Sequence, residues 1–195
     1  SWYVVKEDYF PSVASKYPIA SSFPDVFRSF PVIIEGVPGW EDPMLFTSSH
    51  LKCCGTNSNE AQRQSEADEF MSFMRDAYDT DGNIQLASTA PAVFGGDLNM
   101  VGLAGPIHTL ITGDISDEST YGPDFAPDAD GSDLTEWPIL QSDLPIDFTW
   151  ENPFSEFIPG KLDYIITRDD VAPVLHAFSL NTGVMSVARL FQFSL

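Results

Sequence analysis

The heptapeptide FGGDLNM, residues 94–100, combines two features that decide how we interpret this chain. Its phenylalanine ends an apolar run that has the composition of a buried β-strand. The two glycines that follow allow another backbone or a ligand to approach closely. Asp97 and Asn99 lie two positions apart, so their side chains share a face if the chain is extended. The heptapeptide therefore predicts a strand end that presents a carboxylate beside an amide.

Asp97 and Asn99 can have two different roles at such a strand end. A carboxylate and a neutral amide can hold a divalent ion or orient a water molecule for phosphoryl chemistry, whose transition state is stabilised mainly by positioning and charge. The same two residue types also cap helices and close turns after strands. Taken alone, the heptapeptide favours the cap or the turn, so other charged residues must decide.

Five further segments have the apolar or alternating pattern of short β-strands and are bounded by turn residues. Together with the strand that contains the heptapeptide, they predict substantial sheet content and a mixed α and β class. The six predicted strands are PVIIEG (31–36), MLFTSSHLK (44–52), AVFGGDL (92–98), KLDYIIT (161–167), VLHAFSL (174–180) and ARLFQFSL (188–195).

Two helices are predicted between these strands. Asn57 and Glu60 have the spacing of a capping pair, and apolar side chains then repeat at helical spacing through residues 70–77. This segment predicts one amphipathic helix. A shorter helix is predicted to begin at the Gly-Pro pair at 105–106 and to end near Gly113, because proline suits a first turn and glycine suits a helix exit.

The composition predicts one strongly acidic domain over residues 1–195. The chain has 29 acidic and 9 basic residues, which gives a formal net charge of -20. Such a surface repels phosphate-rich polymers, so we expect no strong binding of duplex DNA. No apolar run has the length of a transmembrane segment, and SWYVVKEDYF lacks the pattern of a signal peptide. We expect a soluble protein that is secreted or periplasmic.

Residues 113–136 form an acidic segment without a single basic residue. Its prolines and glycines argue against regular structure. Asp128, Asp130 and Asp133 surround Gly131 with a spacing that could wrap oxygen ligands around Ca²⁺, but they do not complete the twelve-residue calcium-loop pattern. We favour a solvated loop and keep a Ca²⁺ site as the alternative.

Cys53 and Cys54 are the only cysteines and are adjacent. On a strand their side chains would point to opposite faces, so a bond between them would need a strained turn. We therefore expect free thiols or partners outside this chain.

His50 and Asp163 are charged or titratable residues inside predicted strands. A single strand histidine is usually a structural one, and a strand aspartate can bond to a neighbouring backbone group. In combination with Asp97 and Asn99 they indicate a site for phosphoryl chemistry, because a histidine can donate to a phosphate oxygen and a buried aspartate can fix the tautomer of an imidazole.

Four motifs in this order resemble the endonuclease/exonuclease/phosphatase superfamily, which comprises metal-dependent phosphoesterases and includes DNase I-like enzymes. The resemblance spans nearly the whole chain. It implies a four-layer α-β-β-α sandwich, in which two mixed β-sheets face each other with helices outside. The motifs are ASKYPI (14–19), SSHLKCCG (48–55), FGGDLNM (94–100) and PGKLDYII (159–166).

The resemblance also implies a role for each candidate site residue. Asp97 and Asn99 would bind Mg²⁺ or Mn²⁺ or position the attacking water, and His50 would steady the phosphoryl oxygens. Asp163 would orient a second, catalytic histidine. The reaction would be hydrolysis of a phosphoester by in-line attack of a metal-assisted water.

Two elements of the family pattern are not found in this chain. Family members carry a metal-binding glutamate in an amino-terminal strand and a Ser-Asp-His motif before the last strand. Glu7 is too close to the ASKYPI motif to be that glutamate, and residues 181–195 lack the second motif; His108 and His176 have the pattern of structural histidines. We therefore expect a domain that is incomplete at its amino end and lacks a segment near 186–187. The 195-residue chain alone should turn over little or no substrate.

The expected substrate is a small phosphoester, a lipid headgroup or a short oligonucleotide. Lys52 and Lys161 flank the predicted site and are the candidate substrate-binding residues, whereas Arg63 either joins them or pairs with Glu60 or Glu66. The alternative is an inactive family member that serves as a binding or structural module on the same scaffold.

Overall fold

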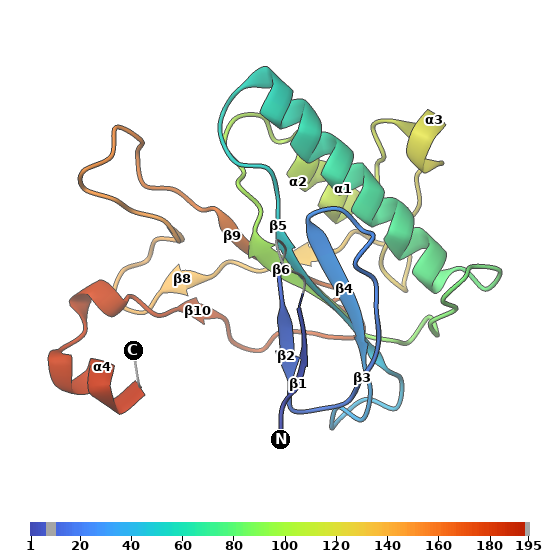
Figure 1. Ribbon diagram of the computed structural model, residues 1–195, viewed down its shortest axis with the longest axis horizontal. Coiled ribbons are helices and arrows are strands. Elements are labelled where there is room, and N and C mark those ends of the chain that lie inside the picture. The colour runs from blue at the N-terminus through green and yellow to red at the C-terminus, as the bar shows by residue number, and fades with distance from the viewer. Residues whose placement is uncertain (7–10, 194–195) are drawn as a thin grey trace.

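A six-stranded mixed β-sheet forms the centre of the molecule in the computed structural model, which describes residues 1–6 and 11–193 (Figure 1). The central strands β5 and β6 are parallel, and every other neighbouring pair in this sheet is antiparallel. The strand order is β3 (Ile19–Ser22), β4 (Ser29–Ile34), β5 (Met44–His50), β6 (Ala92–Asp97), β9 (Asp163–Thr167) and β7 (Thr135–Glu136).

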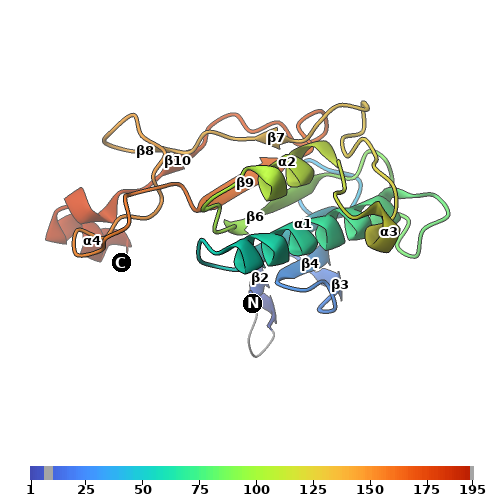
Figure 2. The ribbon, with the colours of Figure 1, turned by 90° about the horizontal axis from the view of Figure 1, so that it is seen from above.

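Helices cover one face of this sheet. The parallel strands β5 and β6 need a crossover connection, and α1 (Asn57–Tyr78) provides it. α2 (Gly105–Thr112) packs beside α1 (Figures 1 and 2). The fully buried Phe70 of α1 stacks on Phe94 of β6, with ring centroids 4.5 Å apart. The apolar stripe of α1 therefore fixes the helix against the strand that carries Asp97.

A hairpin of β1 (Tyr3–Val5) and β2 (Val13–Ser15) contributes to a second, smaller core on the opposite face of the sheet. Val13 packs with Phe30, Val32 and Ile34, which alternate along β4 with residues that face α1. β4 is thus buried on both faces.

The carboxyl-terminal elements lie to one side of the six-stranded sheet (Figures 1 and 2). β8 (Leu140–Gln141) and β10 (Phe178–Ser179) form a parallel pair, followed by η1 (Thr182–Val184) and α4 (Val187–Phe193). The described residues thus form one large sheet and two two-stranded pairs. The mixed α and β class predicted from the strand pattern is confirmed. None of the described helices has the length and apolar character that a bilayer-crossing helix requires.

Four of the six predicted strands correspond to β4, β5, β6 and β9, whereas the two at the carboxyl end do not hold as predicted. The predicted strand 174–180 is reduced to β10. The predicted strand 188–195 is wrong, because residues 187–193 form α4 and residues 194–195 lie outside the described part. The amide of Leu190 donates to the Ser186 carbonyl at 3.0 Å, as in a helix, and no described strand lies alongside to pair with this segment. The short strands β1, β2, β3, β7 and β8 were not predicted.

The two predicted helices are confirmed, but the predicted capping pair of α1 is not. Thr56 is the N-cap, and its hydroxyl accepts from the Asn59 amide at 3.3 Å. The carboxylate of Glu60 is used elsewhere, accepting from the Leu103 amide at 2.6 Å. α2 ends at Thr112, and its C-cap is Gly113, whose φ of +75° suits glycine. The acidic segment is not wholly irregular, since it contains α3 (Glu118–Tyr121) and β7.

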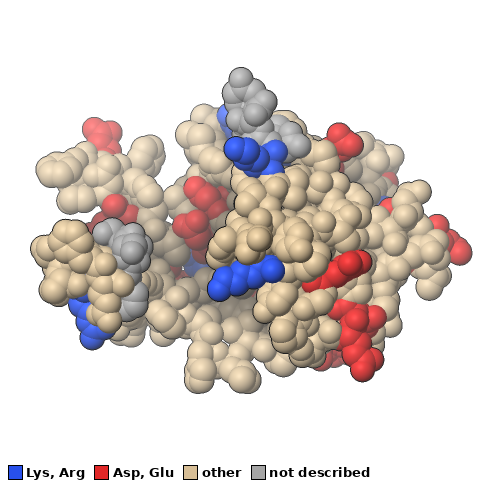
Figure 3. Space-filling model, turned by 60° about the horizontal axis from the view of Figure 1, so that its bottom comes forward, with Lys and Arg blue, Asp and Glu red and all other residues tan. Residues whose placement is uncertain are grey.

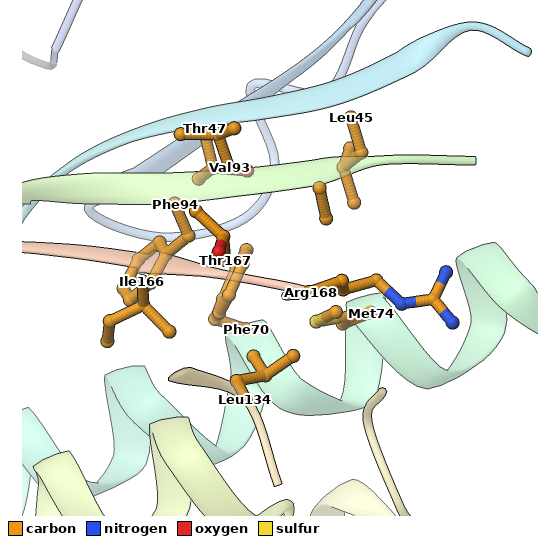
Figure 4. A pocket seen from close by; sticks show the side chains of 11 residues that line it. Leu45, Thr47, Phe70, Met74, Val93, Phe94, Leu134, Ile166, Thr167 and Arg168 are labelled. Carbon is orange, nitrogen blue, oxygen red and sulfur yellow. The ribbon is translucent and has the colours of Figure 1, made fainter. Parts of the chain in front are cut away.

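A small void lies between the sheet and α1 (Figure 4). Its volume is about 10 Å³, and its lining is apolar except for groups such as Thr47 and Arg168. This space holds about one water molecule at most, so it cannot admit a substrate. The candidate functional site must lie elsewhere.

Candidate functional site

Strand register brings three of the predicted site residues side by side at one edge of the sheet. His50 at the end of β5 is the register partner of Asp97 at the end of β6. Asp97 in turn lies opposite Asp163 at the start of β9. Register partners project to the same face, and here it is the face opposite α1, because Phe94, three positions before Asp97, points toward the helix. The Nε2 atom of His50 is 3.9 Å from Oδ2 of Asp97.

The two glycines of the heptapeptide permit this close packing of three strands. A Cβ atom on Gly95 would lie 2.5 Å from the Tyr164 carbonyl oxygen of β9. A Cβ atom on Gly96 would lie 2.0 Å from the Ser49 carbonyl oxygen of β5, and Gly96 has φ +138°. Neither neighbouring backbone could stay in place beside a larger residue. The glycines therefore fix how closely His50 and Asp163 approach Asp97.

Asn99 connects the two loops that follow β5 and β6. It is 7% exposed and has a φ of +50°. Its Nδ2 group donates to the Leu51 carbonyl at 3.0 Å, and its backbone amide donates to Oδ1 of Asp97 at 3.0 Å. Asp97 thus closes a turn with one carboxylate oxygen and faces His50 with the other. Asn99 does not share a face with Asp97, because the chain leaves the extended conformation between them.

The surroundings of Asp97 shift the pKa of its carboxyl group. Burial raises the pKa of the Asp97 carboxyl, and the charge of Asp163 adds to the rise. The hydrogen bond from the Asn99 amide and the nearby His50 act in the opposite direction. Two carboxylates that lie together with one partly exposed imidazole form a site that a cation would stabilise.

Arg63 of α1 holds both loops of the site from behind. It was predicted to lie in a positive pocket or to pair with Glu60 or Glu66, and this prediction is wrong, because its side chain is buried and its guanidinium donates to backbone carbonyls. The donor–acceptor distances are 2.7 Å to Lys52, 3.1 Å to Cys54 and 2.6 Å to Val101. One side chain thus ties the loop after His50 to the loop after Asp97.

Glu66, one helical turn after Arg63, extends this network toward β5. Its Oε2 atom accepts from the Lys52 amide at 2.8 Å, and its Oε1 atom lies 3.2 Å from Nε of Arg28. Arg28 donates through NH1 to the His50 carbonyl at 3.2 Å. Burial raises the pKa of the Glu66 carboxyl, while the Lys52 amide and the arginines oppose the rise. The backbone of His50 is therefore positioned by the partly exposed Arg28, which the buried Glu66 holds in turn.

The two predicted substrate-binding lysines are placed differently. The ammonium group of Lys161 is largely buried, forms an ion pair with Glu136 and lies 4.5 Å from the centroid of the Tyr164 ring. The side chain of Lys52 makes no ion pair with any other described residue and lies on the loop that follows His50. Of the two cations, Lys52 is the one that remains available to a substrate.

The remaining histidines do not join this edge. His108 lies exposed on α2, with Nε2 3.3 Å from Oδ2 of Asp114, and the exposed His176 lies outside any strand. No imidazole of a described residue pairs with Asp163. Glu7, which was considered as a metal ligand, lies outside the described residues.

An open groove of about 570 Å³ lies next to the site. Asn99 lines it, whereas His50, Asp97 and Asp163 do not. Its wall includes Trp150, Phe157 and Ile158, as well as both cysteines. The sequence did not single out these apolar residues, because they lie in a proline- and glycine-containing segment without periodicity.

A second group of carboxylates could hold a metal ion. Oxygen atoms of Asp128, Asp130 and Asp170 lie within 4.8 Å of one another, and this is the only such group of three among the described residues. Asp133 was predicted as a member, but Asp170, which comes from the segment after β9, takes its place. Burial, and then Asp170, raises the pKa of Asp128 to about 6.

The Asp128 group lies at the other end of the sheet from His50 and Asp97. Asp170 follows the carboxyl end of β9, where Thr167 pairs with Val93 near the start of β6. Val93 and Asp97 are four residues apart on one strand, which corresponds to about 13 Å. An ion at the Asp128 group therefore cannot contact a phosphate held by His50.

The comparisons with known proteins concern the family and the fold of this chain. The profile of the Endonuclease/Exonuclease/phosphatase family matches residues 3–186. The fold is similar to a β-hairpin deletion mutant of beta toxin from Staphylococcus aureus, with a TM-score of 0.54 and 16% identity over 87% of this chain and 57% of that one. It is also similar to TDP2 from C. elegans, with a TM-score of 0.50 and 16% identity over 85% of this chain and 47% of that one.

This chain spans only about half the length of these solved structures. The structural similarity shows a shared DNase I-like fold, and because the sequence identity is low it shows no more than that. No curated protein sequence matches the chain. The family profile, however, covers nearly all of the chain, including every residue of the edge formed by His50, Asp97 and Asp163. The chain therefore belongs to the Endonuclease/Exonuclease/phosphatase family.

Proposed function

We propose that the protein to which this chain belongs is a divalent-metal-dependent phosphoester hydrolase. The observation that carries the proposal is the register of three strands, which aligns His50, Asp97 and Asp163 on one face of one sheet edge. Membership of a family named for nucleases and phosphatases supports a reaction at phosphorus.

The residues at this edge fit a hard divalent cation. Asp97 and Asp163 offer carboxylate oxygens, and the Nδ2 bond of Asn99 to Leu51 leaves its Oδ1 atom without a donor among the described residues. Oxygen ligands of this kind suit Mg²⁺ or Mn²⁺. Such an ion, when bound, would polarise a phosphoryl oxygen and lower the pKa of a bound water.

The side chains have separate tasks in this proposal. His50 is half exposed, and its imidazole can donate a hydrogen bond to a non-bridging phosphoryl oxygen. Asp97 and Asn99 hold the ion or orient the attacking water. Asp163 would orient a further histidine if the whole protein supplies one, because none of the three histidines of this chain, all of them among the described residues, pairs with it.

A small phosphoester, a lipid headgroup or a short oligonucleotide fits the charge distribution better than duplex DNA. On the face shown in Figure 3, basic side chains are few and separate from one another. Lys161 is already neutralised by Glu136, which leaves Lys52 as the nearest free cation along the chain. Duplex binding depends on neutralising several phosphates at once.

The alternative is a family member that binds ligands without catalysis. Asp163 has no imidazole partner among the described residues, and this favours the alternative for the 195-residue chain tested alone. The two proposals differ in turnover, so turnover decides between them.

The test is hydrolysis of a generic phosphodiester, bis(p-nitrophenyl) phosphate, with Mg²⁺ or Mn²⁺ by the protein together with any sequence that flanks this chain. His50→Gln and Asp97→Asn should each lower kcat about a hundredfold or more. His108→Gln is the matched control, because it removes a surface imidazole away from the site, and it should leave kcat unchanged. Equal rates for all variants would refute the assignment, and absence of turnover with either metal would favour the binding module.

A further inference from the structure

The loop after β5 brings the sulfur atoms of two adjacent cysteines together. The Sγ atoms of Cys53 and Cys54 are 2.7 Å apart, and both side chains are exposed. The sequence predicted side chains on opposite faces, as on a strand. This prediction is wrong, because β5 ends at His50 and Cys54 has a φ of +79°. The left-handed conformation turns the second side chain back toward the first.

Buried groups of α1 hold this turn in place. The left-handed conformation is unfavourable for a residue with a side chain, so it persists only where the surroundings enforce it. Here the Arg63 guanidinium donates to the carbonyls on either side of Cys53, at Lys52 and Cys54. Glu66 accepts from the Lys52 amide. The folded chain therefore supplies the local turn that a bond between the two cysteines requires.

We propose that Cys53 and Cys54 are a redox site that closes to a vicinal disulfide by exchange with a small-molecule disulfide. One cysteine thiolate attacks the small disulfide, forms a mixed disulfide and expels one small thiolate. The neighbouring cysteine thiolate then attacks the protein sulfur of that mixed disulfide and expels the second small thiolate. The two cysteine sulfurs are oxidised by two electrons, the small disulfide is reduced to two thiols, and these take up the two protons.

Closure needs little movement. A disulfide has a sulfur–sulfur distance of about 2.05 Å, so the two Sγ atoms must approach by roughly 0.7 Å from their present positions. In an unfolded chain, the same residues spend most of their time with side chains pointing apart. The folded chain should therefore favour the ring more than the unfolded chain does.

The cysteine pair also lines the groove next to Asn99. Oxidation would replace two exposed thiols in the groove wall by a rigid ring. The inference does not depend on phosphoesterase activity, since it rests on the turn at Cys54 and the arginine that holds it.

The test is a glutathione redox titration of the whole chain, followed by intact mass and peptide mapping without reduction. The wild type should lose two hydrogen atoms, carry no stable glutathione adduct and yield one peptide with a Cys53–Cys54 bond. Cys53→Ser and Cys54→Ser should each accumulate one glutathione adduct, because no neighbouring thiol is left to displace it. The equilibrium constant for closure should be at least about tenfold larger in buffer than in concentrated urea.

Three results would overturn the inference. The first is a wild type that accumulates glutathione adducts without losing two hydrogens, and the second is a disulfide that forms only between two chains. The third is an equal equilibrium constant in buffer and urea, which would mean that the folded turn contributes nothing.

Discussion

Replacement of Arg63 by methionine tests how the site loops are held. The guanidinium of Arg63 is buried and makes three hydrogen bonds, of 2.7, 3.1 and 2.6 Å, to carbonyls in the loops after β5 and β6. A hydrogen bond to a charged group contributes about 1.5–3 kcal/mol, and bonds made by one side chain do not add fully. Arg63→Met leaves the three carbonyls without this donor, so the free energy of unfolding should fall by about 3–5 kcal/mol.

Urea unfolding measures this loss directly. With a slope of about 2–3 kcal/mol per molar urea for a domain of this size, the midpoint should shift down by about 1–2.5 M. Arg63→Lys keeps the charge but cannot reach all three carbonyls, so its midpoint should lie between those of the wild type and Arg63→Met. If Arg63→Met does not fold at all, Arg63→Lys still shows whether the loss of these hydrogen bonds lowers the urea midpoint.

Arg75 provides a matched control on the same helix. It donates to the carbonyls of Tyr121 and Pro123 at 2.6 and 2.5 Å, far along α1 from the site loops, and it is only partly buried. Arg75→Met should cost about 1–2 kcal/mol and leave Mn²⁺ affinity unchanged, whereas Arg63→Met should weaken Mn²⁺ binding at the Asp97 edge about tenfold or more. An Arg63→Met variant within about 1 kcal/mol of the wild type would refute the reasoning.

Three further predictions concern the scaffold. Gly96→Ala should destabilise the chain strongly, because its Cβ atom would lie 2.0 Å from the Ser49 carbonyl oxygen. In the control Gly131→Ala the Cβ atom would meet no neighbour within 4 Å, so this variant should only add backbone strain. Thermal melts of the two variants measure the difference. In urea unfolding, Phe70→Ala should lower the free energy of unfolding by about 3–5 kcal/mol, because Phe70 is fully buried. Phe157 is exposed, so Phe157→Ala should change it by less than about 0.5 kcal/mol. In EDTA, the raised pKa of Asp128 favours the folded state only while this carboxyl is protonated. The free energy of unfolding should therefore fall as the pH rises from 3.8, the ordinary pKa of an aspartate, to above about 6, the pKa of Asp128 in the folded chain. Urea titrations across this pH range measure the slope, and Asp128→Asn should remove it.

Much of the sheet was predictable from sequence because its central strands are short apolar runs between turn residues. β5 and β6 carry buried side chains on the α1 face, and this pattern is strong enough to be recognised without partners. The carboxyl-terminal segment was misread for the same reason, since the apolar residues of 188–195 fit a strand pattern that has no neighbour to pair with. Pairing is a long-range property that the local pattern does not contain.

The sequence predicted candidate site residues by their type and order, but it did not predict their geometry. Only the register shows that His50 and Asp163 lie on either side of Asp97. The sequence analysis did not predict that Arg63 would hold the two site loops, although the position of Arg63 on the helix indicated that it is buried. Residues 63, 67, 70 and 74 share one face of α1, so Arg63 belongs to the buried stripe and not to the solvated face. Similarly, the left-handed turn at Cys54 has no sequence signature, because glycine is the residue that usually marks such a turn.

Paramagnetic broadening by Mn²⁺ tests the central claim most directly, because it locates the bound ion on the folded chain. Backbone amide signals of the chain would be followed by NMR while Mn²⁺ is added in substoichiometric amounts. If Asp97 belongs to the metal site, the signals of His50, Asp97 and Asp163 should broaden first, and Asp97→Asn should abolish this effect. Broadening confined to the segments of Asp128 and Asp170, at the other end of the sheet, would contradict the account.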